Sequence, residues 1–463
     1  MSAPNGGQMR FFSRVLPALL LAVVLIANSG CSKEPSDSRT IITIPTPGGE
    51  MNQKMYAELI PAFEKANPNI RVVRMDVPNS TFYVKLQVMI AGGSAPDLIP
   101  MMTMRLPMFL HRNAFLPLDD LMAQDPEFQA LKPDIYAKSM DGFSRNGKIY
   151  GLAYSQNLYG LYYNKTMFDE YNKTCPPDQR ITYPSADWDT DKFLDVAKKL
   201  TRDTDGDGRA DQFGTVVNTA AFYVCAPVLR RFGANLFNPE GPEQRICLLD
   251  SPEAIRAFDW YYGLSVRERV APSPKGRDSR TSGGLIGGPE EQFMAGKIAM
   301  WEDAAEWRFE FQRRITQFDW DVAEPPRGPA PQHIQTAGYE CFGMSISSTT
   351  KHPKEAWRFL RFMVSPEGQK IIARNRVGIP ILKSLCHDRE YYLKDTDPPH
   401  SKEPFLKTLE YGQDIPSLRN FQEVEKAITD ELDMVMTGDR SAEEACRRAA
   451  TEANRLLKED AEQ

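Results

Sequence analysis

The sequence NGKIYGLAYSQNLYGLYYNKTMFDEYN, Asn146–Asn172, is the stretch around which the rest of the chain is interpreted. It is rich in tyrosine and alternates apolar with polar residues, which predicts one or two β-strands. Gln156 and Asn157 lie among the tyrosines, and the stretch contains neither histidine nor cysteine. Its only carboxylates, Asp169 and Glu170, stand together near its far end. These residue types can hold a polyhydroxylated ligand but do not cleave one.

Length and charge limit the classes of protein that remain. A chain of 463 residues is too long for one small core, so two or three lobes are expected. The formal net charge is −6, and no basic stripe runs along the sequence. A nucleic-acid-binding protein would carry such a stripe. The sequence therefore predicts no nucleic-acid partner.

The N-terminus has the pattern of a targeting segment. Arg10 and Arg14 precede the apolar run Val15–Ala27, which is shorter than the roughly 20 residues that span a bilayer. A short apolar run behind positive charge and before small residues is typical of a secretory signal.

The end of that segment resembles a bacterial lipobox. The residues ANSGC, 27–31, place Cys31 where such motifs carry the acylated cysteine, although Asn28 stands where leucine is usual. Plain secretion is the alternative. We expect residues 1–31 to be a lipoprotein signal segment and residues 32–39 to be a polar tether.

Six further cysteines are scattered along the chain: Cys175, Cys225, Cys247, Cys341, Cys386 and Cys446. They form no C-x-x-C pair, so a zinc site is not expected. An exported protein could pair some of them, and the sequence leaves that pairing open.

Strand and helix patterns alternate at the start of the mature chain. Strands are predicted at 40–45, 70–75 and 97–101, with helices ending at 66 and spanning 82–90. This order predicts parallel β-α-β units in a layered α/β lobe. Ligands of such sheets lie beyond the carboxyl ends of the strands, which places Gly48–Glu50 and Met102–Arg105 at the rim of a site. A simple turn at Gly48 is the alternative.

The second half continues the α/β pattern. Helices are predicted at 188–200, 254–266, 353–364, 421–436 and 442–457, with another from Ser365, and a strand at 343–347. Ser365 and Ser441 have the pattern of helix N-caps. The proline-rich residues 325–331 predict a linker.

An ordered series of motifs resembles family 1 extracellular solute-binding proteins, the sugar-capturing components of bacterial ABC importers. The series includes LIPAFEKANPNIRV at 59–72, AGGSAPDLI at 91–99, FLPLDD at 115–120, GKIYG at 147–151, YNK at 163–165 with Phe168, FMAGKIAM at 293–300, AWRFL at 356–360, GIP at 378–380 and TG at 437–438. The motifs run in order over nearly the whole mature chain.

The resemblance implies an α/β, two-lobed periplasmic-binding-protein type II fold with a ligand cleft between the lobes. The N-terminal lobe would comprise residues 40–153 and 327–378, and the C-terminal lobe residues 158–322 and 385–463. The chain would cross between them near 152–158, 322–328 and 376–385. The opening stretch then contains the first crossing, with Ala153–Leu158 at the cleft floor, and most of its tyrosines become packing residues.

Sugar binding requires aromatic faces for the C–H side of a pyranose and polar groups for its hydroxyls. The resemblance points to Trp301, Glu302 and Trp307 after the FMAGKIAM motif, with one of the two tryptophans expected in the core. It also aligns Asn157 with a ligand-contacting acidic position of the maltose-binding members.

Other candidates come from loops around the expected cleft, and a solvated surface role is their alternative. Glu50 and Arg105 lie on first-lobe loops, Tyr339 and Glu340 precede the predicted strand at 343, and Arg419 precedes the last helix pair. An anionic ligand would favour Arg105 or Arg419 in the cleft.

A second motif predicts a cation site. Asp203, Asp205, Asp207 and Asp211 occupy positions 1, 3, 5 and 9 of an EF-hand-type loop, with the Arg209 carbonyl at position 7. Position 12 is Gly214 rather than glutamate, so the loop is incomplete. Relatives that bind alginate oligosaccharides have a calcium loop in this region. Structural Ca²⁺ is the prediction and a plain acidic turn the alternative; no other cofactor is expected.

No enzyme motif accompanies these features. The five histidines are isolated, and the adjacent pair Asp119 and Asp120 suits helix capping better than hydrolysis. We therefore expect a non-enzymatic, monomeric, lipid-anchored extracytoplasmic protein on the periplasmic side of a bacterial cell membrane. It would capture a carbohydrate and deliver it to ABC permease subunits. A sensing or surface-display lipoprotein without an importer is the alternative.

Overall fold

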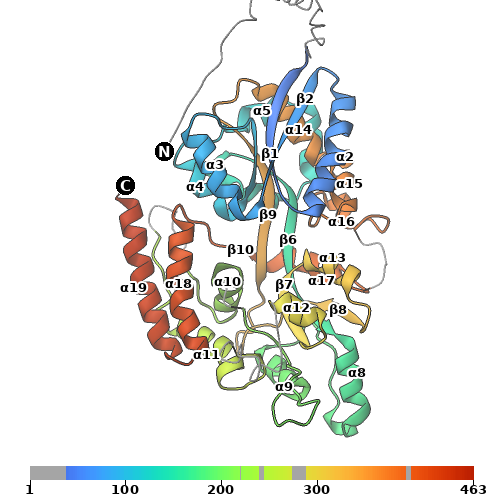
Figure 1. Cartoon of the computed structure of the whole chain (residues 1–463), viewed down its shortest axis with the longest axis vertical. Coiled ribbons are helices and arrows are strands. Elements are labelled where there is room, and N and C mark those ends of the chain that lie inside the picture. The colour runs from blue at the N-terminus through green and yellow to red at the C-terminus, as the bar shows by residue number, and fades with distance from the viewer. Residues whose placement is uncertain (1–37, 219–220, 239–244, 274–287, 393–397, 463) are drawn as a thin grey trace, which may run out of the picture. The chain divides into compact units, whose positions relative to one another are not determined.

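The computed structural model describes residues 38–218, 221–238, 245–273, 288–392 and 398–462 (Figure 1). The signal segment 1–31 with Cys31, and most of the tether, lie outside these described residues. Residues Thr40–Gln463 pack as one unit around two long strands, β6 and β9.

Strand β6, Leu152–Asn164, is buried at every one of its 13 positions. It pairs antiparallel with β7 (Met300–Ala304), β8 (Trp320–Ala323) and β9 (Ala337–Ile346). The opening stretch therefore forms one long interior strand, with the two-residue strand β5 (Lys148–Ile149) just before it. Because both of its faces are covered, the alternation of polar and apolar residues produces no exposed face.

The largest sheet has the order β10–β9–β6–β7, with β3 added to β9 and β8 to β6. In Figure 1, β6 and β9 run side by side through the middle of the unit. The remaining strands are β1 (Thr40–Pro47), β2 (Ile70–Val77), β3 (Leu98–Met102), β4 (Ser144–Arg145) and β10 (Gly412–Asp414).

The first β-α-β unit forms as expected. Helix α2 (Glu50–Ala66) connects β1 to β2, which pair in parallel. The third strand differs from the expectation, because β3 pairs antiparallel with β9. The Asp97 carboxylate, just before β3, accepts hydrogen bonds from the backbone N–H and the hydroxyl of Thr43, both 2.8 Å long. Side-chain bonds therefore join β3 to β1, while its ladder partner lies far along the chain.

Helices cover the sheets on both sides. Their bounds are α3 Phe82–Ala91, α4 Leu106–Leu110, α5 Asp119–Ala123, α6 Pro126–Leu131, α7 Ala137–Asp141, α8 Lys165–Thr174, α9 Thr190–Leu200, α10 Ala221–Arg231, α11 Pro252–Val266, α12 Pro289–Met294, α13 Trp307–Arg314, α14 Pro353–Val364, α15 Pro366–Arg374, α16 Lys383–Cys386, α17 Glu403–Tyr411, α18 Phe421–Met436 and α19 Ala442–Ala461. Short 3₁₀ turns lie at Asn79–Thr81, Thr103–Arg105, Lys132–Asp134 and Pro177–Gln179.

Local sequence signals explain several helix starts. The Ser365 hydroxyl accepts from the Gly368 N–H and the Ser441 hydroxyl from the Glu444 N–H, each at 3.2 Å, so both predicted N-caps form. The predicted capping by Asp119 and Asp120 does not form: both lie in the first turn of α5, whose N-cap has no side-chain hydrogen bond, and the Asp119 carboxylate instead accepts from the Ile149 N–H at 3.2 Å.

Aromatic packing fixes the sheet end that holds β7 and β8. Tyr162 is fully buried, and its ring lies 5.1 Å from Phe311, 5.9 Å from Trp301 and 6.0 Å from Trp320. Its hydroxyl donates to the Ala304 carbonyl at 2.8 Å. This cluster holds the end of β7 and the start of α13 in place, and the start of α13 borders the cavity described below.

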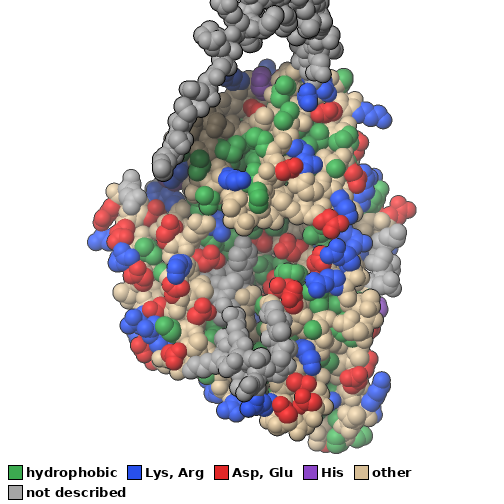
Figure 2. Space-filling model, viewed as in Figure 1, with side chains coloured by type: hydrophobic (Ala, Val, Ile, Leu, Met, Phe, Trp, Pro, Cys, Tyr) green, Lys and Arg blue, Asp and Glu red, His purple; other side chains and the backbone are tan. Residues whose placement is uncertain are grey.

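Surface charge and cysteines complete the description. On the coloured part of the face in Figure 2, acidic and basic side chains are interspersed rather than gathered into a stripe. Within the described residues the cysteines after Cys31 are free thiols, and all except Cys175 are buried. No helix in the described part of the chain is long and apolar enough to cross a membrane.

Candidate functional site

A cavity of about 490 Å³ lies against β6 and β9. It is lined by the β1–α2 turn (Pro47–Asn52), Asn79, Phe82, Tyr83, the end of β3 (Pro100–Met102), Tyr154, Glu306, Trp307, Glu310, Phe342 and Arg376–Gly378. The volume is in the range of sites for small ligands, and the lining is largely apolar and aromatic with a few polar groups. These are the ordinary properties of a ligand site.

Two polar side chains from the central strands, Asn157 and Glu340, are not part of the cavity lining, but Glu340 lies close enough to the lining residues Tyr83 and Glu306 for their charges to interact. Asn157 on β6 donates its amide to the Glu340 carboxylate on β9 at 3.2 Å, and both side chains are buried. Asn157 Oδ1 and Glu340 Oε2 have no hydrogen-bond partner among the described residues. A buried polar atom without a partner is costly, so these two atoms favour a ligand whose groups can both donate and accept hydrogen bonds.

Three carboxyl groups lie near one another here. Burial, together with the charges of Glu306 and Asp303, raises the pKa of Glu340 to about 8, while the Asn157 hydrogen bond opposes the rise. Burial also raises the pKa of Asp303 to about 7, and it raises the pKa of Glu306 above its ordinary value, opposed by Arg308. The carboxyl groups of Glu340 and Asp303 are therefore partly protonated near neutral pH.

Trp307 supplies an aromatic wall. It begins α13, and its indole N–H donates to Asp303, which holds the ring in one orientation. The ring lies 5.6 Å from Trp301 and 6.3 Å from Phe311, stacked on the latter. Trp307 is partly exposed and lines the cavity. Its ring is therefore accessible to the apolar face of a ligand.

Arg105 lies behind the cavity lining, against Tyr83. Its guanidinium lies 4.0 Å from the Phe421 ring at the start of α18 and 5.5 Å from the Tyr83 ring. Arg105 Nε and Nη1 are buried without a hydrogen-bond partner among the described residues. These atoms are donors, and they complement the unpartnered acceptors of Asn157 and Glu340.

Glu50 and Gly48 lie at the rim, as the strand-end rule predicts. Both line the cavity. Glu50 is exposed and pairs with Lys54 at 2.7 Å and with Arg313 on α13 at 3.4 Å. The second ion pair connects α2 to α13 across the cavity mouth.

Seven of the ten sequence candidates do not line this cavity: Arg105, Asn157 and Glu340, described above, and the four that follow. Trp301 is 2 % exposed and packs on Tyr162, while Glu302 pairs with the buried Arg231 at 2.8 Å. Both instead border a cavity of about 30 Å³. The Tyr339 hydroxyl donates to Gln156 at 3.2 Å, and Arg419 bonds Asp460 on α19 at 2.9 Å. In this conformation the four side chains hold the fold together, and their ligand roles remain predictions.

Sequence reasoning missed several residues of the site. Tyr83 lies on helix α3 rather than on a strand-end loop. Asp303 and Glu306 lie in sequence between Trp301 and Trp307, the two tryptophans predicted as ligand residues. Arg376 and Gly378 have positive φ angles of 63° and 70° and line the cavity within the predicted third crossing. The sequence signal for Asp303 and Glu306 is that both are carboxylates close to the aromatic candidates Trp301 and Trp307.

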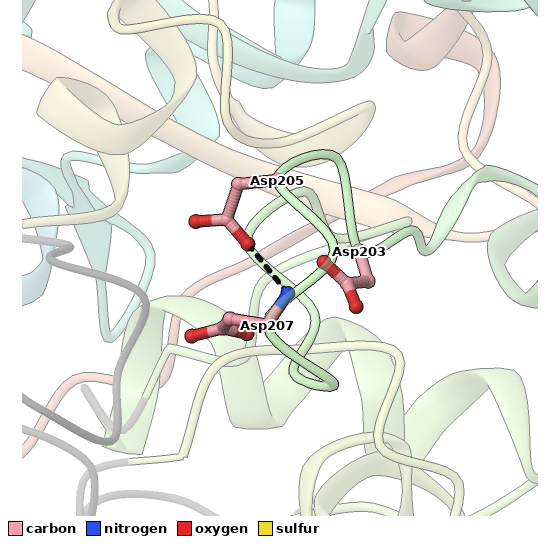
Figure 3. A group of neighbouring side chains, drawn as sticks. All are labelled: Asp203, Asp205 and Asp207. Carbon is pink, nitrogen blue, oxygen red and sulfur yellow. Dashed lines mark hydrogen bonds between the residues drawn. The ribbon is translucent and has the colours of Figure 1, made fainter.

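The acidic loop, residues 203–211, is not part of the cavity lining. Asp203, Asp205 and Asp207 offer carboxylate oxygens within 4.8 Å of one another (Figure 3). The Gly206 and Gly208 N–H groups donate to Asp203 at 2.6 and 2.7 Å. Asp211 is outside this group, because it accepts from Thr204 and lies 3.4 Å from Lys297. Three hard oxygen donors fit part of a calcium shell.

Comparison with known proteins identifies the family. A model of the family described as bacterial extracellular solute-binding protein matches residues 48–370, and the chain belongs to this family. Its members are binding proteins. The chain is 23 % identical over 403 residues, 85 % of its length and 79 % of the relative's, to an uncharacterized lipoprotein in the oleD 5′ region of Streptomyces antibioticus.

Solved structures show the same fold. An ABC substrate-binding protein from Listeria monocytogenes, in complex with cycloalternan, has a TM-score of 0.75 and 26 % identity and covers 91 % of this chain and 99 % of its own. A cyclic α-maltosyl-1,6-maltose binding protein from Arthrobacter globiformis has a TM-score of 0.73 and 16 % identity over 91 % and 100 %. The predicted two-lobed α/β fold class is confirmed, while the residue bounds of the lobes remain a prediction.

Proposed function

We propose that this protein is the extracytoplasmic solute-binding component of an ABC importer and captures a sugar or oligosaccharide in its cleft. It binds without cleaving, and the closed, loaded protein delivers the ligand to permease subunits. The single observation that carries the proposal is a cavity of ligand size with an aromatic wall, Trp307, and with unpartnered buried polar atoms of Asn157 and Glu340 near its lining residue Glu306.

The chemistry of the cavity supports a carbohydrate. A pyranose ring has an apolar C–H face, which suits Trp307 and Tyr83, and a rim of hydroxyls that both donate and accept. Glu340 and Asn157 offer acceptors, and Arg105 offers donors. The solved relative from Listeria, at 26 % identity, holds a cyclic oligosaccharide, which also favours this class of ligand.

A binding screen tests the proposal. Thermal shift and calorimetry on the purified chain are run against neutral mono- and oligosaccharides, uronates and non-carbohydrate solutes. We expect saturable binding of at least one sugar, which raises the melting temperature as the concentration exceeds Kd. Arg455→Gln, on the exposed surface of α19, is the control variant and should bind equally. If no sugar binds while a non-carbohydrate solute does, the proposal is contradicted.

Lipid anchoring is part of the same proposal. The lipobox-like residues 27–31, the lipoprotein relative from Streptomyces and the extracellular family support acylation at Cys31. Detergent phase partition of the expressed wild type against Cys31→Ser measures it. We expect the wild type in the detergent phase and the variant in the aqueous phase; equal partition would contradict the anchor.

A further inference from the structure

Three basic side chains bond one short segment of the chain, Gly412–Ser417, and a fourth, Arg245, lies near two of them. Lys138 on α7 donates to the Gly412 carbonyl, Arg230 on α10 donates to the Asp414 carbonyl at 2.9 Å, and Arg145 on β4 donates to the Ser417 hydroxyl at 3.1 Å. Arg245 lies close enough that its charge lowers the pKa of Arg230, and the charge of Arg145 lowers that of Arg245. We call these four residues the basic cluster.

The basic cluster lies on the face of β9 opposite the candidate site. Successive side chains of a strand point to opposite faces. Glu340 bonds Asn157 and lies on the cavity side with Phe342, whereas Tyr339 carries the Lys138 ammonium over its ring at 4.7 Å. The cluster is therefore separated from the sugar cavity by the sheet itself.

Among the described residues, the positive charge of the cluster is not balanced: two carboxylates, Asp414 and Asp141, face four cations. None of the four cations has an ion-pair partner within 4.0 Å in the part of the chain that the structure describes, and Arg230 Nη1 and Arg245 Nε are buried without a hydrogen-bond partner there.

Burial and mutual repulsion make this arrangement unfavourable without a counter-ion. Burial lowers the pKa of Arg230 to about 10, and burial also lowers the pKa values of Arg145, Arg245 and Lys138. Buried cations that repel one another and leave donors unused cost stability, and an anion in their midst would recover it.

We propose that the basic cluster is a binding site for a multivalent oxyanion, a phosphate or sulfate group, on the face of the sheet opposite the sugar cleft. Guanidinium groups donate in pairs to tetrahedral oxyanions, and an ammonium adds a point charge. A doubly charged group offsets the excess of two cations over carboxylates. The oxyanion is either a free ion or the phosphate of a lipid headgroup, since both present the same atoms.

The test is a titration of the purified chain with sodium phosphate against sodium chloride at equal ionic strength, followed by calorimetry and thermal melting. We expect phosphate at about ten times its Kd to raise the melting temperature by about 2 °C over chloride. Arg230→Gln should weaken phosphate binding about tenfold, the loss of one charge-assisted hydrogen-bonded partner.

Arg245→Gln separates a binding site from a structural charge cluster. Because it removes repulsion and an unpartnered buried donor, it should raise the melting temperature in chloride while abolishing the phosphate response. Arg256→Gln, which removes an exposed arginine paired with Glu253 on α11, is the charge-matched control and should keep the full response. Destabilisation of Arg245→Gln in chloride with an unchanged phosphate response would overturn the proposal.

Vesicles distinguish the two sources of the oxyanion. Binding to vesicles with phosphatidic acid, but not to phosphatidylcholine vesicles, with competition by free phosphate, supports a headgroup; response to soluble phosphate alone supports a free ion. No phosphate effect in either arm, or an equal effect on all variants, overturns the proposal. Sugar binding measured on the same variants should be unchanged, so this outcome is independent of the proposed import function.

Discussion

The two faces of the β6–β9 pair have opposite chemistry, although alternate residues of the same two strands form them. On one face Glu340 and Asn157 present unpartnered acceptors beside Asp303 and Glu306. On the other, Tyr339 lies beneath Lys138, within the basic cluster. Adjacent residues of one interior strand thus face a group of carboxyl side chains on one side and the basic cluster on the other. What decides the chemistry of each face is the set of loops and helices packed against it, rather than the strand itself.

The strongest test of the cavity face is loss of its aromatic wall. Trp307→Ala should weaken sugar binding by about 30-fold or more, the effect of removing a central aromatic anchor worth about 2 kcal/mol. Calorimetry with the best sugar from the screen measures it. Tyr183→Phe, an exposed ring away from the cavity, is the control and should bind as the wild type does. Equal affinity of Trp307→Ala and the control would remove this side chain from the site.

Glu340 gives the cavity face a pH dependence. Folding raises the pKa of Glu340 from 4.5 to about 8, so the folded chain holds a proton that the unfolded chain releases. The stability contributed by this proton is fully present below about pH 4.5 and is lost as the pH rises through about 8. Glu340→Gln mimics the protonated form, and it should therefore reduce the fall in melting temperature between pH 5 and pH 8 by about 2 °C.

The control for that measurement is Glu410→Gln, an exposed glutamate on α17 paired with Lys407. It should leave the slope of melting temperature against pH unchanged. Asp303 and Glu306 face Glu340 and titrate with it, and Arg308 faces Glu306, so the double variant Asp303→Asn, Glu340→Gln should flatten the slope further. A slope identical in Glu340→Gln and wild type would contradict the buried carboxyl.

The acidic loop belongs to neither face and serves as an outside reference. The sequence predicts calcium at Asp203, Asp205 and Asp207, so a chelator should lower the melting temperature by about 2 °C and added calcium should restore it. Asp205→Asn should make the protein insensitive to chelator. Sugar affinity should not follow either change, and a wild-type melting temperature unaffected by chelator would leave the loop an acidic turn.

The smallest effect is expected from Lys138→Met. This change removes a charge from the back face but touches nothing in the cavity, so sugar affinity should stay within about twofold of wild type. The same calorimetric assay that detects Trp307→Ala measures it. A tenfold loss would mean that the two faces are coupled through the sheet and would break the separation drawn between them.

The sequence predicted what depends on neighbouring residues. The N-caps Ser365 and Ser441, the parallel β1–α2–β2 unit and the helix α11 follow from local patterns, and the structure has all of them. The antiparallel pairing of β3 with β9 could not be predicted in the same way. It joins Leu98 to Ile346, and no local pattern specifies a partner so far along the chain.

The candidate site likewise contains residues that local sequence predicts and residues whose position depends on tertiary packing. Gly48 and Glu50 followed from the rule that ligands lie beyond strand ends, and both line the cavity. Trp301 and Trp307 could not be told apart from sequence, because which of two nearby tryptophans is buried depends on Tyr162 and Phe311 packing against it. The basic cluster was invisible to the sequence, since its members come from four separate segments and become neighbours only after folding.

The pairing of β6 with β9 also has a consequence for how the protein comes into being. Asn157 and Glu340 are 183 residues apart in sequence, and β6 is buried along its whole length. Contacts between such distant segments close large loops and slow folding to milliseconds or longer. When the N-terminal part of the chain emerges first, β6 lacks its main partner strand until β9 follows, so export must finish, or a chaperone must intervene, before the core can close. Refolding faster than about a millisecond, followed by tyrosine and tryptophan fluorescence, would contradict this order of events.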